Sequence, residues 1–288
     1  MYASSVAARP PSGKRRILLP PPQSEGRQGN PGGNGGDGKA AVLAEIHRLA
    51  RQRRGKVSEL TSLDTSLRHL LGTLKEEERM QILFEHWARS YNRDMKEHAQ
   101  AVRRILRKLK HSIRGHVVDL STGTGLVPLT IQQFGGVQSV LANDLSPAML
   151  AIARRTLKDY PLPIAFECKG AVSLVSPQPA GSVFLSQTLH LLPNHGRAMV
   201  IVNAYRMLEA GGNFFLIDEW PARVRPVHDL ISALLDSVFH PIGLDDLRRS
   251  IQTDIRLLVE RESHITDIQD SSGRTTHQMY GIRFEKIG

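Results

Sequence analysis

Two aspartates and a pair of glycines stand at spacings that suit the binding of a small ligand. The segment VVDLSTGTGL, residues 117–126, runs from β-branched residues into Asp119 and then into Gly123 and Gly125. Glycines allow a sharp turn and let the backbone approach a ligand with no Cβ in the way. A helix beginning after such a loop offers free N–H groups to an anion. Because Asp119 would repel a pyrophosphate, the arrangement favours a ligand that carries a cationic amine.

A second acid, Asp144, ends the apolar run VQSVLAND. A carboxylate at the end of the second strand of a βαβ unit is placed to accept hydrogen bonds from ribose hydroxyls. S-adenosylmethionine (SAM) combines an amine, a carboxylate and a ribose. Its amine would meet Asp119 or nearby carbonyl groups, its carboxylate the N–H groups of the glycine loop, and its ribose Asp144.

The elements that must position these residues alternate between short apolar runs and helical patterns. We expect strands at HVVDLS, VQSVLAND, PIAFEC, SVFLSQ and NFFLIDEW, with helices over 126–134, 147–159, 195–209 and 226–239. Such alternation is typical of a parallel sheet covered by helices on both faces. IRLLVERESHI and HQMYGIRFEKI flank a DSSG turn and predict an antiparallel pair that closes the sheet. Ser146 and Pro147 suit the N-cap and first position of a helix.

The N-terminal third differs in charge and composition. Residues 1–110 hold 22 Lys and Arg against 11 Asp and Glu, whereas residues 111–288 hold 16 against 17, so the net charge of +10 belongs to the first part. Residues 1–38 are rich in Pro and Gly and are expected to be a disordered basic tail. Residues 39–74 are expected to form a helical extension with helices over 39–54 and 57–71. Residues 75–288 then form the main domain, with a broken pair of helices over 75–110 and a core sheet from about residue 115.

The motifs resemble those of the class I SAM-dependent methyltransferases over about residues 80–288. VVDLSTGTGLVPLTI matches their first motif and VLANDLSPAMLAIARR their second, while FEHWARSYNRDM resembles the entry segment of the ubiquinone/menaquinone subgroup. The resemblance implies a Rossmann-like seven-stranded, mostly parallel sheet with an antiparallel last strand, helices on both faces and extra N-terminal helices. It implies SAM as cofactor. The cofactor residues expected on the motifs and their matching segments are Tyr91, Asp119, Ser121, Thr122, Gly123, Gly125, Asp144, Leu145, Met149, Gly170, Ala171 and Gln187.

This chain departs from the family after the third strand. The family commonly has Gly-Asp-Ala there, and its acid contacts the adenine amine; CKGAVSL offers Gly170 and Ala171 without an acid. His190 follows the fourth strand and is the candidate general base, or else a histidine that packs against or caps the next turn. Glu219 ends the fifth strand and could bind an acceptor amine, or else is a solvated strand-end acid.

The sequence favours an enzyme that methylates O, N or C of a small-molecule acceptor by direct in-line transfer. One alternative is an RNA or protein methyltransferase that holds its substrate with the basic N-terminal region; another is a non-catalytic SAM-binding or assembly protein. The single cysteine and the histidine spacings predict no metal site. No membrane span is expected. We expect a cytoplasmic protein, or a mitochondrial one if residues 1–38 are a transit peptide.

Overall fold

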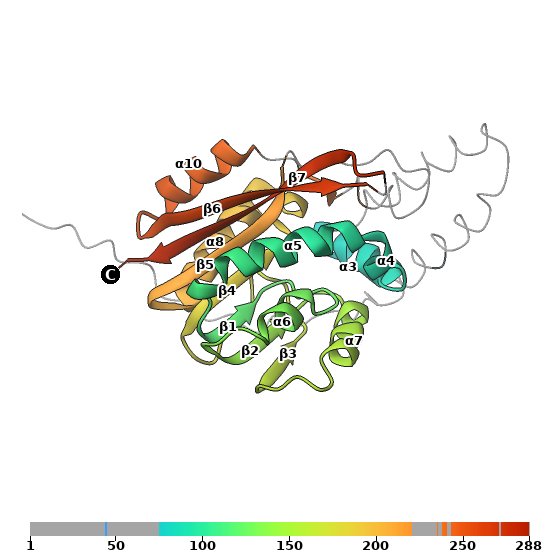
Figure 1. The fold of residues 1–288 in the computed structure, drawn as a ribbon, viewed down its shortest axis with the longest axis horizontal. Coiled ribbons are helices and arrows are strands. Elements are labelled where there is room, and N and C mark those ends of the chain that lie inside the picture. Colours follow the sequence, from blue (N-terminus) through green and yellow to red (C-terminus); the bar gives the residue numbers. More distant parts are fainter. Residues whose placement is uncertain are drawn as a thin grey trace, which may run out of the picture.

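Seven strands form one sheet in the order β3-β2-β1-β4-β5-β7-β6 (Figure 1). The computed structural model describes residues 44, 75–220, 235, 238–240, 243–270 and 272–287. Neighbours from β3 to β5 are parallel, and β7 is antiparallel to both β5 and β6. The strands are β1 (Gly115–Asp119), β2 (Val137–Asn143), β3 (Ile164–Glu167), β4 (Ala180–Ser186), β5 (Leu208–Trp220), β6 (Leu258–Gln269) and β7 (Thr275–Lys286).

Helices cover both faces of this sheet. The described helices are α3 (Glu76–Trp87), α4 (Tyr91–Asp94), α5 (Lys96–Leu109), α6 (Leu126–Ile131), α7 (Pro147–Thr156), α8 (Asn194–Met207) and α10 (Leu244–Asp254), with 3-10 turns η1 (Lys110–Ser112) and η2 (Leu189–Leu191). Helices α5 and α6 share one apolar cluster with the sheet, and α8 and α10 share the other. The βα alternation and the antiparallel last strand expected from the sequence are therefore confirmed.

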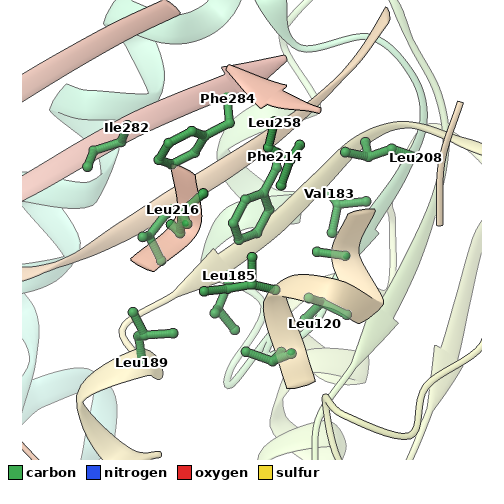
Figure 2. Packing of buried hydrophobic residues seen from close by; sticks show 14 of the residues in the cluster. Leu120, Val183, Leu185, Leu189, Leu208, Phe214, Leu216, Leu258, Ile282 and Phe284 are labelled. Carbon is green, nitrogen blue, oxygen red and sulfur yellow. The ribbon is translucent and has the colours of Figure 1, made fainter. Parts of the chain in front are cut away.

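Central strands read as continuous apolar runs because both of their faces are buried. Along β5, Phe214 and Leu216 enter the cluster beneath α8, whereas Phe215 and Ile217 enter the cluster beneath α5. Figure 2 shows the first cluster, in which the Phe214 ring stacks on Phe284 of β7 at 6.1 Å between centroids. The two layers fix β5 in the sheet, and with it the residues at its carboxyl end.

A glycine in β7 lets α5 approach the sheet closely. A Cβ at Gly281 would lie 2.2 Å from Cγ2 of Ile105, so only glycine fits opposite that side chain. His98, Val102 and Ile105 are all buried and recur along α5 at spacings that place them on one helical face. The contact at Gly281 thereby brings His98 down toward the sheet as well.

The expected break in the N-terminal helices is present, at two points rather than one. Segment 75–110 divides into α3, α4 and α5, and the indole N–H of Trp87 donates to Asp94 at 3.0 Å across the α3–α4 corner. Ser146 caps α7 as expected, since its hydroxyl accepts from the N–H of Met149 at 3.3 Å. The helices expected over 39–54, 57–71 and 226–239 lie outside the described residues, apart from residues 44, 235, 238 and 239. Within the described parts, no helix is long and apolar enough to cross a membrane.

Candidate functional site

The glycine loop, residues 120–125, folds around the carboxylate of Asp144. Asp144 accepts from the N–H of Gly123 at 2.8 Å and from the N–H of Ser146 at 2.9 Å. The N–H of Thr122 donates to the carbonyl of Asn143 at 2.7 Å, and that of Gly125 to the carbonyl of Thr122 at 2.8 Å. With the N–H of Leu120, which donates to the carbonyl of Phe184 at 3.0 Å, four loop N–H groups are already bonded within the protein. This corrects the expectation that the loop amides as a set would receive a ligand carboxylate.

Asp119 lies fully buried at the carboxyl end of β1. Neither of its carboxylate oxygens has a hydrogen-bond partner of ordinary geometry among the described residues. Burial raises the pKa of Asp119 to about 7, although the nearby Thr122 hydroxyl and Ser121 N–H favour its charged form. Burial likewise raises the pKa of Asp144 to about 6, against the two N–H groups that it accepts from.

Two cavities open beside the glycine loop. The larger, here called the Asp144 cavity, has a volume of about 430 Å³ and carries the carboxylates of Glu76, Glu77 and Asp144. The smaller, the Arg103 cavity, has a volume of about 310 Å³, and Lys96 and Arg103 are its charged residues. Both volumes fall in the range of small-molecule sites. The two cavities share five lining residues, namely Tyr91, Ser121, Gly123, Ser186 and Gln187.

Most of the expected cofactor residues line these cavities. The Asp144 cavity is lined by nine of them: Tyr91, Ser121, Gly123, Asp144, Leu145, Met149, Gly170, Ala171 and Gln187. Thr122 lines the Arg103 cavity. Asp119 and Gly125 line neither cavity. The alternative that nearby carbonyl groups, rather than Asp119, meet the ligand's amine is therefore favoured.

Tyr91 stands at the junction of the two cavities. Its ring packs edge-on against Trp87 at 5.0 Å and against Phe84 at 6.4 Å between centroids. Burial and the nearby carboxylate of Asp144 raise the pKa of the Tyr91 hydroxyl, so it stays neutral. Contacts with Phe84 and Trp87 of α3 thus hold the Tyr91 ring where it lines both cavities.

Gln187 has an unusual backbone at the end of β4. Its φ is +52°, and it is the one described residue other than glycine with positive φ. Such a conformation costs of order 1 kcal/mol and persists where the surroundings enforce it. The buried side-chain nitrogen Nε2 has no hydrogen-bond partner among the described residues. Gln187 therefore carries an unused hydrogen-bond donor, and it is one of the five residues that line both cavities.

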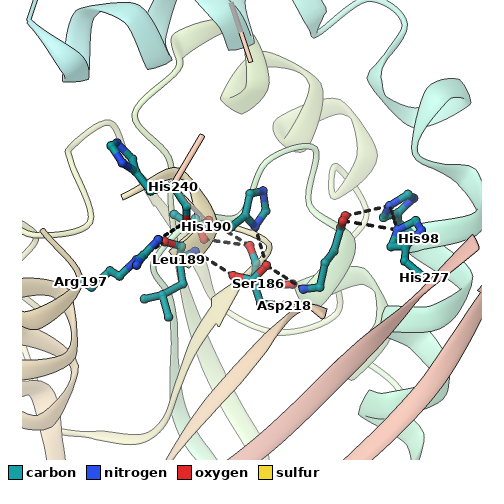
Figure 3. Close-up of polar contacts among 11 residues, drawn as sticks. His98, Ser186, Leu189, His190, Arg197, Asp218, His240 and His277 are labelled. Atoms are coloured by element: carbon teal, nitrogen blue, oxygen red, sulfur yellow. Dashed lines mark hydrogen bonds and ion pairs between the residues drawn. The ribbon is translucent and has the colours of Figure 1, made fainter. Parts of the chain in front are cut away.

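His190 lines neither cavity and is held by Asp218 (Figure 3). Its Nδ1 lies 2.5 Å from Oδ1 of Asp218. The Asp218 carboxylate also accepts from the N–H of Leu189 at Oδ2 and from the N–H of Glu219 at Oδ1. Burial opposes the imidazolium, but Asp218 outweighs it and raises the pKa of His190 above its usual value. A general base must lie within hydrogen-bond reach of the proton that it removes, and His190 lines neither of the two cavities in which a ligand would bind. The geometry favours the other interpretation, in which His190 fastens turn η2 to β5.

Glu219 also lies away from both cavities. Its carboxylate is largely buried and contacts His98 and His277. Although burial opposes it, the neighbouring side chains of His277 and His98 hold the pKa of Glu219 well below its usual range. The expectation of a solvated strand-end acid is therefore wrong, since the imidazoles replace water around this carboxylate.

Several lining residues had no sequence signal of their own. Glu76 and Glu77 come from α3, and Lys96 and Arg103 from α5. A Cβ at Gly170 would lie 2.9 Å from Oε1 of Glu77, so this carboxylate stands beside the segment that lacks the family's acid. These residues reach the site through tertiary packing, which residue spacing does not encode.

The two loop glycines are expected to respond differently to alanine. Both have positive φ, +54° at Gly123 and +92° at Gly125, so each alanine should cost about 1 kcal/mol of unfolding free energy. A Cβ at Gly125 would also lie 3.0 Å from Leu157, whereas one at Gly123 meets nothing within 4 Å and enters the cavities. Urea unfolding should therefore show the larger loss for Gly125→Ala. Titration with S-adenosylhomocysteine (SAH) should show the larger loss, about tenfold, for Gly123→Ala; the reverse ranking would contradict this geometry.

Comparison with known proteins agrees with this architecture. Residues 117–212 match a family model described as a methyltransferase domain. These residues form a class I SAM-dependent methyltransferase domain. They include the glycine loop, Asp144, Gly170 and Gln187, while assignment of the domain to the ubiquinone/menaquinone subgroup stays a prediction.

Three known proteins are similar to parts of this chain. Carboxy-S-adenosyl-L-methionine synthase from Chromohalobacter salexigens is 34% identical over 110 residues, which is 36% of this chain and 40% of the relative. The chain thus spans about two fifths of that relative's length. A DhpI–SAH complex is similar with TM-score 0.53 and 18% identity, covering 73% of this chain and 97% of DhpI. N-methyltransferase NodS from Bradyrhizobium japonicum is similar with TM-score 0.50 and 14% identity, covering 69% and 99%. At these identities the structures support the fold of the methyltransferase domain.

Proposed function

We propose that the protein is a SAM-dependent methyltransferase that acts on a small-molecule acceptor. The observation that carries this proposal is a pair of cavities of opposite charge that share the glycine loop. The charges of SAM are distributed in a way that matches these cavities, because SAM has a neutral adenosine, a cationic sulfonium and a carboxylate. A ligand that spans both cavities would place its hydroxyl and cationic groups near carboxylates and its anionic group near Arg103.

The residues present fit such a ligand. Asp144 retains free lone pairs on both oxygens for ribose hydroxyls, and Glu77 beside Gly170 is placed to accept from the adenine amine. Lys96 and Arg103 would receive the carboxylate in place of the loop amides, and Nε2 of Gln187 is a further donor at the junction. Tyr91 would lie against the sulfonium, where an aromatic face is favourable to a cation.

When bound, SAM supplies a methyl group that its sulfonium has already activated. The protein's part is then to align an acceptor and to exclude water, which can lower a barrier by about 7–11 kcal/mol. The apolar side of the Asp144 cavity, formed by Met80, Phe84, Leu191 and Leu192, is suited to an acceptor with an apolar body. Such a pocket favours a small molecule over a nucleic acid strand, which binds through its phosphates.

The relative that makes carboxy-SAM motivates a second candidate function. In that reaction SAM is the compound that is modified, so a SAM site in this fold does not by itself imply methyl transfer. The cationic Arg103 cavity could hold an anionic co-substrate or product carboxylate as readily as the carboxylate of SAM.

Mass spectrometry of reaction mixtures separates these functions. The full chain would be incubated with SAM and a panel of small amines, phenols and carbon acids, with SAM and a panel of small carboxylic acids as carboxyl donors, and with SAM and RNA at low salt. SAH formed together with a methylated small molecule would support the proposal. Methylated RNA would support the alternative that uses the basic N-terminal region, and a carboxylated SAM would support the second candidate. A folded protein that binds SAM but consumes none of it would favour the non-catalytic alternative.

A further inference from the structure

Three side chains from distant parts of the chain converge at the edge of the sheet where β5 ends. His98 comes from α5, Glu219 from the end of β5 and His277 from the beginning of β7. Since β7 runs antiparallel to β5, its first residues lie beside the last residues of β5, with Trp220 opposite Gln278. The close contact of Ile105 with Gly281 brings α5 over the same place. Figure 3 shows the rings of His98 and His277 side by side, facing one carboxylate.

The ligand atoms of this cluster are close together and shielded from water. Nε2 of His98 lies 2.8 Å from Oε1 of Glu219 and 2.9 Å from Nε2 of His277, and the latter nitrogen lies 3.4 Å from Oε2 of Glu219. The three side chains are 7%, 12% and 8% exposed, respectively for His98, Glu219 and His277. A metal ion with bonds of about 2.0–2.2 Å places neighbouring ligand atoms about 2.8–3.6 Å apart in octahedral or tetrahedral geometry. The observed spacings between the ligand atoms fall within this range.

The hydrogen bonds around His277 indicate where its proton lies. The hydroxyl of Thr276 donates to the carbonyl of Ile268 at 3.1 Å, so it must accept from Nδ1 of His277, 2.9 Å away. Neutral His277 then carries its proton on Nδ1, and its Nε2 directs a lone pair toward Glu219 and His98. Lone pairs from an imidazole and a carboxylate that face Nε2 of His98 can be satisfied in two ways: by the N–H hydrogen of a neutral His98, or by a metal ion that takes the place of that hydrogen.

We propose that His98, Glu219 and His277 form a binding site for a divalent transition-metal ion such as Zn²⁺. Two imidazole nitrogens and a carboxylate are ligands that such ions favour, and three protein ligands leave positions open to water or to another ligand. Thr276 supplies the outer hydrogen bond that orients a metal-bound imidazole, as is usual in such sites. The site is independent of the proposed function, and it differs from the prediction that the histidine spacings give no metal site.

Titration of the full chain with Zn²⁺ and with Co²⁺ tests this site. Metal-free protein should take up one equivalent of Zn²⁺ in competition with a chromophoric chelator, and Co²⁺ should give visible d–d absorption. His277→Gln and Glu219→Gln should each weaken binding by at least about 100-fold, and Thr276→Val by about tenfold. His264→Gln is the matched control, because His264 pairs with Glu262 at 2.6 Å on β6 and the described residues offer no third metal ligand beside this pair.

Each outcome decides the matter. Loss of the Co²⁺ spectrum in the two ligand variants, with the His264→Gln spectrum unchanged, would support the site. No stoichiometric uptake by the wild-type chain would overturn it and leave the N–H of His98 as the donor to Glu219 and His277. Equal uptake by wild type and ligand variants would also overturn it, since the metal would then bind elsewhere. If a ligand variant fails to fold, the wild-type stoichiometry and the Thr276→Val titration still decide.

Discussion

At pH 8, Asp119→Asn is expected to raise the free energy of unfolding by about 2–3 kcal/mol. Burial raises the pKa of Asp119 to about 7, from an ordinary value near 4. Folded protein therefore binds more protons than unfolded protein between about pH 4 and 7, and stability falls as pH rises through that window. A shift of about three units corresponds to about 4 kcal/mol, of which an unpaired asparagine amide would offset about 1–2 kcal/mol.

Urea unfolding of both proteins at pH 5 and pH 8 measures this effect. The gain should be present at pH 8 and absent at pH 5, where Asp119 is already neutral. Asp159→Asn is the control, because it makes the same substitution at a side chain that is 87% exposed. An Asp119→Asn protein that is no more stable than wild type at pH 8 would show that the carboxylate is solvated or paired in solution.

Asp144→Ala is expected to weaken SAH binding by at least about 100-fold, or 2.7 kcal/mol. The substitution removes the acceptor proposed for the ribose and releases the N–H groups of Gly123 and Ser146 that shape the loop. Hydrogen bonds to a charged group contribute about 1.5–3 kcal/mol each, so loss of two is sufficient. Asp144→Asn should have an intermediate effect, since one acceptor oxygen remains.

Calorimetry of the folded variants checks this prediction. Glu167→Gln is a suitable control, because Glu167 is an acid on the neighbouring strand β3 whose side chain is 44% exposed and lines neither cavity. Unchanged SAH affinity in a folded Asp144→Ala protein would mean that the ligand does not use this carboxylate.

The succession of strands and helices along the chain could be predicted from the sequence because each element carried a local signal. Strands buried on both faces are continuous apolar runs, and Ser146 with Pro147 marks a helix start. The positions of Gly123 and Asp144 followed from the same pattern, because the carboxyl ends of parallel strands meet at one edge.

The charges around the cavities could not be predicted in this way. Glu77 and Arg103 arrive on helices whose docking depends on aromatic contacts at Tyr91 and on the close approach at Gly281. The pairing of His190 with Asp218 likewise depends on how η2 turns back onto β5. The cluster of His98, Glu219 and His277 depends on the register between β5 and β7 and on the position of α5 against the sheet. Both are properties of the folded chain.

Calorimetric titration of the purified full chain with SAM and with SAH tests the central claim most directly. We expect one site per chain with micromolar affinity for both ligands, and affinity that rises between pH 5.5 and 8 as Asp144 ionises and becomes a stronger acceptor for the ligand's hydroxyls. Absence of binding to either ligand by a folded protein across that range would contradict the proposal that these cavities hold SAM.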